Sequence, residues 1–298
     1  MRIRNWILCL AAVITIGGGG YGLHQYLASS ARGSEYREFN ATFEAEKETQ
    51  EALELYKNGK AKPATILKPA DSSSKVVYLY FCGLPDRPMT EKIVDLLEKK
   101  KGTAAFFAEG QNAMDEEEVM KLLHKKGHLL GNYTWLGRPS FEKVEAEEAI
   151  RSLCKTQKAI KLMGGDSPLY FKAPNTQYTD ELLKEAGACG LRYAVESTLT
   201  IKRGQLKSAS DAEEVVKKIK PGNFIAFEIN RPLDIRAQEQ GKYDEKPAID
   251  KKPTIKDDSK KEEVAKDTTV QQIEWLVEAL TEEGYTLQDL KRAVGVSG

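Results

Sequence analysis

One short segment, residues 79–86 (LYFCGLPD), carries side chains that could do chemistry at the end of a strand. The apolar run over 76–81 predicts a buried strand that stops at a Gly/Pro turn, so Cys82 and Gly83 lie at its carboxyl-terminal tip. Parallel-sheet enzymes place their catalytic residues at such tips. A thiol there could act as a nucleophile if a base or a cation favoured the thiolate. Asp86 could bind a metal, but an Asp at this point is typical of a capped turn.

Histidines are scarce in this chain, which has only His24, His124 and His128. His124 and His128 have a spacing of four, which on one helix would suit a metal pair. However, Gly127 ends the predicted helix, and His128 then begins a strand at the end opposite to its tip. We therefore interpret both as surface or helix-end histidines, and we expect no metal ligands and no metal cofactor.

The charge balance is neutral. The 298 residues include 45 basic and 45 acidic side chains. Such a balance gives no electrostatic footprint for a polyanion, so we expect no nucleic-acid partner.

The first 33 residues are typical of a membrane-targeting segment. Arg2 and Arg4 precede an uncharged run over 6–16 and a glycine-rich stretch. This pattern favours an uncleaved signal-anchor, and cleavage after Ala31 is the alternative. In either case the positive flank stays in the cytoplasm, so we expect an extracytoplasmic body that is anchored to the cytoplasmic membrane or secreted.

Three cysteines follow this segment: Cys82, Cys154 and Cys189. An odd number cannot pair completely within one chain. We interpret them as buried free thiols.

The rest of the chain divides by pattern. Residues 34–74 predict a charged stalk helix followed by a linker, 75–231 alternate short apolar strands with amphipathic helices, and 232–267 form a charged insertion. A closing helix and strand occupy 268–298. The expected strands span 76–81, 103–108, 128–132, 169–171, 191–195, 223–227 and 285–290, and the expected helices span 90–99, 115–126, 143–163, 179–186, 212–219 and 269–282. This alternation predicts a parallel sheet, either a barrel or an open doubly wound sheet.

The order of five segments resembles the polysaccharide deacetylases of carbohydrate esterase family 4, also known as the NodB homology domain. Residues 75–86 resemble the family's opening strand, which usually ends in Thr-Phe-Asp-Asp-Gly-Pro. The other similar segments are TAAFFAEG (103–110), GHLLGNYT (127–134), FKAPNT (171–176) and KPGNFIAFE (220–228), and EEGYTL (282–287) resembles the closing junction. The resemblance implies an α/β fold, a distorted parallel (β/α) barrel with one groove at the carboxyl ends of its strands.

The resemblance also implies a reaction. Family enzymes hold a divalent metal, often zinc, through one Asp and two His, and they use a second Asp as base and a His as acid to remove acetyl groups from envelope sugars. The metal polarises the carbonyl and acidifies a water, and the carboxylate accepts the proton. The implied partner is a cell-wall or envelope glycan.

This chain departs from the family at each of those positions. Cys82 stands for the base Asp and Gly83 for the metal-binding Asp. Tyr133 stands for the first His ligand, and the second falls on Gly137 or, with a shift of one residue, on Arg138.

The remaining positions depart too. Lys172 stands for the arginine that orients the base, Asn175 for the tyrosine beside the oxyanion site, and Glu228 for the acid histidine. We therefore expect an inactive protein.

Three hypotheses follow. The first is a non-catalytic glycan-binding module whose groove is lined by Tyr133, Trp135, Lys172, Asn175 and Glu228. The second is a divergent carbohydrate deacetylase that uses a different set, with Cys82 as nucleophile near Lys172, or with Glu228 and Asp86 as metal ligands. The third is a scaffolding or regulatory protein.

Overall fold

The computed structural model describes residues 43–229 and 268–294. The predicted membrane segment (1–33) and the predicted charged insertion (232–267) lie outside the described residues. Within the described part, none of the helices is both long and apolar enough for a membrane span.

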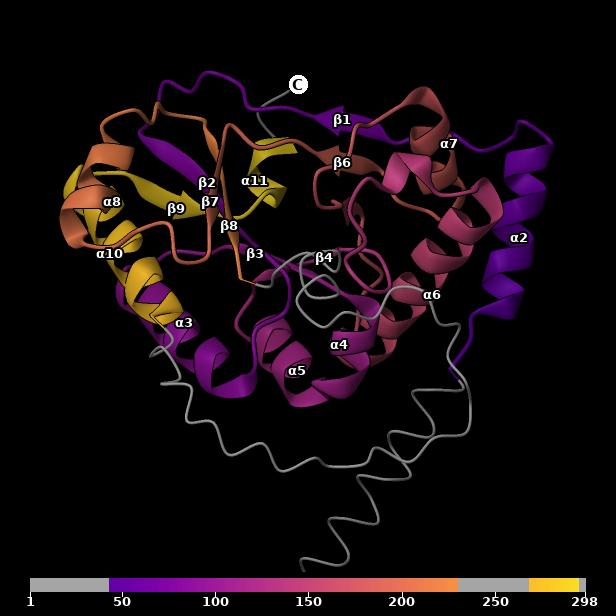
Figure 1. Ribbon diagram of the computed structural model, residues 1–298, viewed down its shortest axis with the longest axis horizontal. Coiled ribbons are helices and arrows are strands. Elements are labelled where there is room, and N and C mark those ends of the chain that lie inside the picture. Colours follow the sequence, from indigo (N-terminus) through magenta and orange to yellow (C-terminus); the bar gives the residue numbers. More distant parts are fainter. Residues whose placement is uncertain (1–42, 230–267, 295–298) are drawn as a thin grey trace, which may run out of the picture. The chain divides into compact units, whose positions relative to one another are not determined.

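A single sheet organises the described residues (Figure 1), and all of its strand pairs are parallel. The strands are β1 (Thr65–Leu67), β2 (Val76–Cys82), β3 (Ala105–Ala108), β4 (Leu129–Asn132), β5 (Tyr170–Phe171), β6 (Tyr193–Val195), β7 (Leu199–Lys202), β8 (Phe224–Glu228) and β9 (Thr286–Gln288). The order is β1-β6-β5-β4-β3-β2-β8-β7, and β9 also pairs with β2. Because this order begins at β1 and ends at β7, the sheet is a half-barrel. The predicted parallel α/β architecture is confirmed.

Helices follow the strands along the chain (Figure 1). They are α2 (Glu46–Lys57), α3 (Arg87–Lys99), α4 (Gly110–Asp115), α5 (Glu117–Lys125), α6 (Ala146–Gly164), α7 (Asp180–Ala188), α8 (Ala209–Val216), α10 (Thr269–Glu282) and α11 (Lys291–Val294), with a 3-10 turn, η1, at Phe141–Lys143. The predicted closing helix coincides with α10, and the predicted helix over 115–126 corresponds to α5, whereas α4, just before it, was not predicted.

Strand β2 is the centre of the sheet, and its sequence VVYLYFC is apolar throughout. Such a run is typical of a strand that is buried on both faces. Leu79 and Phe81 contribute to the core beneath the helices, whereas Tyr78, Tyr80 and Cys82 contribute to the core inside the half-barrel. The Cys82 side chain therefore lies on the inner face of the sheet.

The segment before β2 differs from the prediction. Helix α2, expected within a stalk, packs against α6 and α7 and buries Thr49 and Ala52. The predicted linker over 61–74 contains β1, which pairs with β6 through Thr65 and Tyr193. A strand of three residues between prolines gives too short a pattern to recognise in the sequence.

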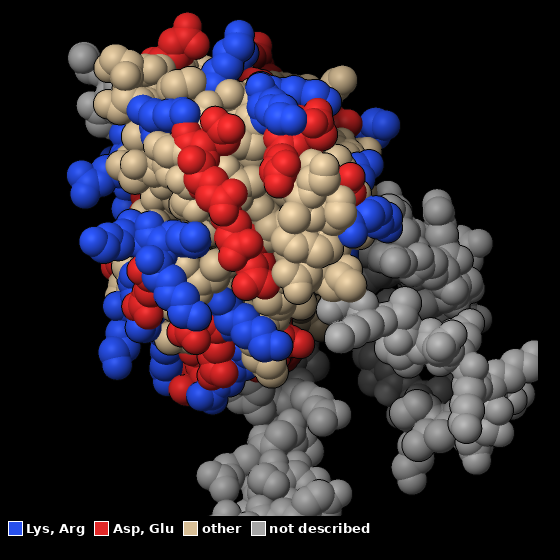
Figure 2. Space-filling model, turned by 90° about the vertical axis from the view of Figure 1, so that its left-hand side faces the viewer, with Lys and Arg blue, Asp and Glu red and all other residues tan. Residues whose placement is uncertain are grey.

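Charges of both signs are mixed on the surface that Figure 2 shows, which carries α8 and α10. Exposed ion pairs such as Lys217–Glu214 (2.6 Å) and Arg87–Glu91 (2.8 Å) lie on the helices of this region. A band of acidic side chains runs across this face and is flanked by basic ones, so neither sign covers the face alone.

Glu185 is a buried carboxyl group on α7, with 4 % of its surface exposed. Burial, and then the nearby Glu181, raise its pKa to about 7. Because the native pKa is higher than the unfolded one, the native state binds more protons between about pH 4.5 and 7, so stability falls as the pH rises through this window. We expect Glu185→Gln to stabilise the protein by about 2 kcal/mol at pH 8 and to have little effect at pH 4. Urea unfolding at the two pH values measures this, with the exposed Glu213→Gln as control; an equal effect of Glu185→Gln at both values would contradict it.

Candidate functional site

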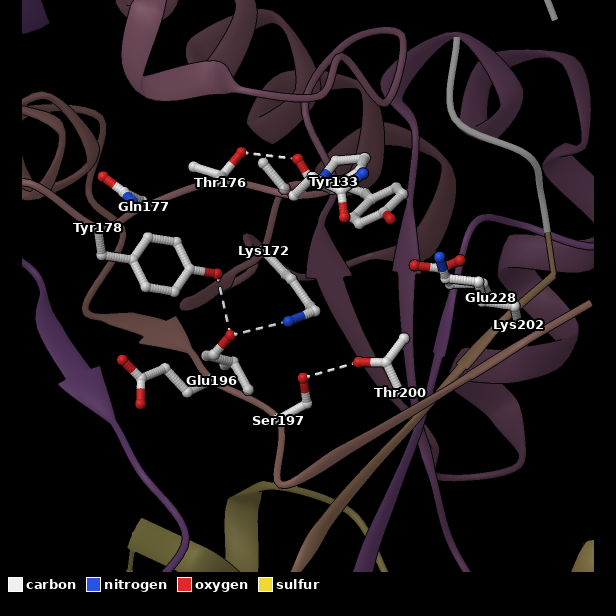
Figure 3. A pocket seen from close by; sticks show the side chains of 14 residues that line it. Tyr133, Lys172, Thr176, Gln177, Tyr178, Glu196, Ser197, Thr200, Lys202 and Glu228 are labelled. Carbon is white, nitrogen blue, oxygen red and sulfur yellow. Dashed lines mark hydrogen bonds between the residues drawn. The ribbon is translucent and has the colours of Figure 1, made fainter. Parts of the chain in front are cut away.

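A pocket of about 520 Å³ opens at the carboxyl ends of β5 to β8 (Figure 3). Four residues proposed from the sequence line it: Tyr133, Lys172, Asn175 and Glu228. Sequence reasoning missed seven other polar lining residues, namely Thr176, Gln177, Tyr178, Glu196, Ser197, Thr200 and Lys202. Four of these lie either in the connection between β6 and β7 or on β7 itself, and β7 was not predicted.

Lys172 and Tyr178 are joined at one backbone oxygen (Figure 3). The Lys172 amine donates to Val195 O at 3.2 Å, and the Tyr178 hydroxyl donates to the same oxygen at 2.9 Å. Burial lowers the pKa of Lys172, whereas the nearby Cys82, Glu228 and Glu196 raise it. The amine is thus held by the end of β6, and two of its three hydrogens remain for other acceptors.

The opposite wall of the pocket contains an acid and a base that are paired by register. Lys202 of β7 lies beside Glu228 of β8, which in turn lies beside Cys82 of β2. In-register residues of parallel strands project to the same face, so these three side chains form one row. Burial raises the pKa of Glu228, and Lys202 and Lys172 lower it. With Glu196, the pocket carries two cationic and two anionic side chains.

Tyr133 lines the pocket, and Cys82, which is not among the lining residues, packs against it. Both are buried, at 1 % and 4 % exposed, and the thiol and the hydroxyl are hydrogen-bonding neighbours. Burial raises the pKa of Cys82 to about 12, although Lys172 lowers it. The thiol therefore stays protonated near neutral pH, which disfavours the nucleophile hypothesis.

Comparison with known proteins gives a family match for the middle of the chain. A sequence model described as polysaccharide deacetylase matches residues 70–194. This region belongs to the polysaccharide deacetylase family. The chain is 31 % identical over 149 residues to a peptidoglycan-N-acetylglucosamine deacetylase of Bacillus cereus, covering 50 % of this chain and 54 % of that protein. It is 24 % identical over 195 residues to the peptidoglycan-N-acetylmuramic acid deacetylase PdaC of Bacillus subtilis, covering 58 % and 42 %.

The fold is similar to that of a pseudoenzyme of carbohydrate esterase family 4 from Bacillus anthracis, with a TM-score of 0.55 and 16 % identity over 79 % of this chain and 70 % of that chain. The chain spans about half the length of the curated relatives named above.

In this deacetylase-family domain, Trp135 does not line the pocket, which corrects the predicted groove. Its indole packs against Gly110 of α4, and the Lys155 amine of α6 lies 4.2 Å from the ring centroid. Thr134, just before it, has a left-handed backbone (φ 63°), so the chain turns away from the pocket at this residue. The sequence gives no sign of a left-handed Thr.

Arg138, Gly137 and Asp86 also lie outside the pocket lining. Arg138 Nη1 donates to Glu148 Oε1 at 2.7 Å on α6. Asp86 caps α3, where its Oδ1 accepts the Met89 N–H at 2.9 Å, as its sequence position indicated. Gly83 has a φ of 95°, and its N–H donates to Phe107 O at 2.9 Å. Cys82 and Gly83, the two residues at the tip of β2, have no carboxylate group.

Glu109 is a buried residue that sequence reasoning missed. It lies just after β3 and is 2 % exposed. Its Oε2 accepts the Leu84 N–H at 2.9 Å, and its Cγ would lie 3.3 Å from a Cβ placed on Gly137. Glu109 therefore lies between the loop after β2 and the loop after β4. The sequence did contain a signal for this residue, since Glu109 is the one acidic residue in the otherwise apolar segment AAFFAEG.

The residues present do not fit the divalent metal that the family implies. Among residues 43–229 and 268–294, no three His, Cys, Asp or Glu are grouped so that they could hold an ion. His124 is half exposed, with its Nδ1 3.8 Å from Asp166 Oδ2. His128 precedes β4 and is buried, and its Nδ1 accepts the Ala104 N–H at 3.4 Å. Since the pocket opens at the other end of the strands, neither histidine reaches it.

Proposed function

We propose that this chain is a non-catalytic member of the polysaccharide deacetylase family that binds a cell-wall glycan on the outer side of the cytoplasmic membrane. One observation carries the proposal: Cys82 and Tyr133 pack together, and these are the residues that the resemblance aligns with the catalytic base and the first metal ligand. The names of the curated relatives support peptidoglycan as the ligand class, and the B. anthracis pseudoenzyme is a precedent for lost catalysis within the fold. The N-terminal segment supports membrane anchoring.

The pocket supports carbohydrate as the ligand. Its volume of about 520 Å³ suits a small saccharide, and its lining offers donors and acceptors of several kinds. The ammonium of Lys172, the carboxylate of Glu228 and the hydroxyl of Thr200 can each bond a sugar hydroxyl or amide. Since Trp135 lies elsewhere, we assign recognition to these polar groups.

Two assays on the purified full chain test the proposal. Acetate release is measured from peptidoglycan and from N-acetylglucosamine oligomers, with and without added zinc or cobalt, and retention on insoluble peptidoglycan is measured by co-sedimentation. We expect retention and no acetate. Acetate released at a metal-dependent rate would establish the divergent-deacetylase hypothesis instead, and absence of both signals would favour the scaffolding role.

Two pocket substitutions should weaken glycan binding. Lys172→Met removes the ammonium, and Glu228→Gln removes the charge while it keeps the shape of the side chain. Each loses one charge-assisted hydrogen bond to the sugar, so we expect the Kd to rise about tenfold in each variant. The exposed Lys99→Met and Glu213→Gln are matched controls. Unchanged affinity in both pocket variants would remove this pocket as the binding site.

A further inference from the structure

Two cysteines far apart in the sequence meet beneath α2. Cys154 lies on α6, and Cys189 directly follows α7. A helical side chain leans toward the amino-terminal turn, so the Cys154 thiol lies over the turn that begins at Ile150. The Cys189 thiol reaches that same turn, where its Sγ is 3.5 Å from Ile150 O.

The surroundings bring the two sulfurs together. Cys154, Cys189 and Ile150 belong to one cluster with Ala52 of α2, and the Cys154 thiol is a hydrogen-bonding neighbour of the Cys189 thiol. Both thiols are free in the structure. Cys154 Sγ also donates to Glu48 O of α2, at 3.6 Å, so α2 covers the pair.

The pair is open to a small reagent from one side. Cys154 is only 3 % exposed, but Cys189 is partly exposed. Both line a pocket of about 360 Å³, together with Glu51, Leu55 and Lys158. A small disulfide can therefore reach Cys189 first, and Cys154 is then the nearest thiol.

We propose that Cys154 and Cys189 form an intrachain disulfide that fastens α6 to the end of α7. In the first step, the Cys189 thiolate attacks a disulfide oxidant, so that one oxidant sulfur leaves as a thiolate and a mixed disulfide remains on Cys189. In the second step, the Cys154 thiolate attacks Cys189 Sγ and displaces the other oxidant sulfur. Two protein thiols lose two protons and two electrons, and the oxidant disulfide becomes two thiols. Formation of this disulfide is independent of the proposed glycan binding. Only the expectation that the bond forms in the cell rests on the extracytoplasmic location proposed above, because disulfides persist in oxidising compartments.

The environment of Cys189 determines how the rate of disulfide formation depends on pH. Burial and the neighbouring Cys154 raise the pKa of the Cys189 thiol well above its ordinary value. The thiolate is therefore rare at neutral pH, and the reaction should accelerate as the pH rises.

The test uses the purified full chain, reduced and then incubated with oxidised glutathione at increasing pH. Free thiols are alkylated in denaturant, and peptides are mapped by mass. We expect a linked pair of peptides that contain Cys154 and Cys189, loss of two of the four alkylated thiols, and a Tm that is higher by roughly 10 °C, since the bond closes a loop of about 35 residues. Cys82→Ser, the matched control, should form the same link.

The variants separate the outcomes. Cys154→Ser should hold glutathione on Cys189 and show no rise in Tm upon oxidation. If Cys154→Ser fails to fold, the proposal is still tested by comparing the peptide map and the Tm of the oxidised wild type with those of the reduced wild type. Four alkylated thiols at every pH, or a lasting mixed disulfide on Cys189 in the wild type, would overturn the proposal.

Discussion

Tyr133→Ala should lower the free energy of unfolding by about 3 to 5 kcal/mol, as large aromatic truncations in cores do. The ring is 4 % exposed and packs in the core inside the half-barrel, where it contacts Cys82. Our account assigns it the space that the family resemblance gives to a metal and its ligands, and because the ring is buried, its loss should leave a cavity. Urea unfolding followed by circular dichroism measures the change.

A conservative variant isolates the role of the ring. Tyr133→Phe keeps the volume and loses only the hydroxyl beside the Cys82 thiol, so we expect a loss of about 1 kcal/mol. A loss below about 1 kcal/mol for Tyr133→Ala would show that the ring does not fill the site.

His128 should make the protein less stable in acid by up to about 3 kcal/mol. Burial lowers its pKa to about 4, and Nε2 has no hydrogen-bond partner within the described residues. Because the native pKa is lower than the unfolded one, the unfolded state binds more protons between about pH 6.5 and 4. Stability is therefore complete above this window and falls as the pH falls through it. His128→Gln should remove this dependence, as urea unfolding from pH 4 to pH 7 would measure.

The opposite effect of Glu185 must be separated from that of His128. Both groups titrate over nearly the same pH range, so their effects partly cancel in the wild type. The comparison is therefore made in a Glu185→Gln background, with the half-exposed His124→Gln as control. If the free energy of unfolding changed with pH equally with and without His128, the assignment of this pH dependence to His128 would be contradicted.

The sequence predicts the central fold because its signals are long and consistent. The run VVYLYFC defines β2, and the amphipathic pattern over 269–282 defines α10. The short edge strands β1 and β7 are different: three or four residues carry little periodicity, and their place is fixed by pairing with β6 and β8.

The candidate site was predictable only where residues sit at strand tips. Cys82 and Glu228 end their strands, and register alone brings them side by side. Trp135 was misplaced because the left-handed backbone of Thr134 turns the loop away. Tyr178 was missed because a loop path, which a linear pattern does not encode, brings it to the pocket, and Lys202 was missed because β7 was not predicted.

The most direct test of the central claim is the metal content of the purified full chain, measured by plasma mass spectrometry after incubation with zinc and removal of the excess. Our account predicts much less than one ion per chain, with no change in Cys82→Ser or Glu228→Gln. One retained zinc per chain that either substitution removes would contradict it.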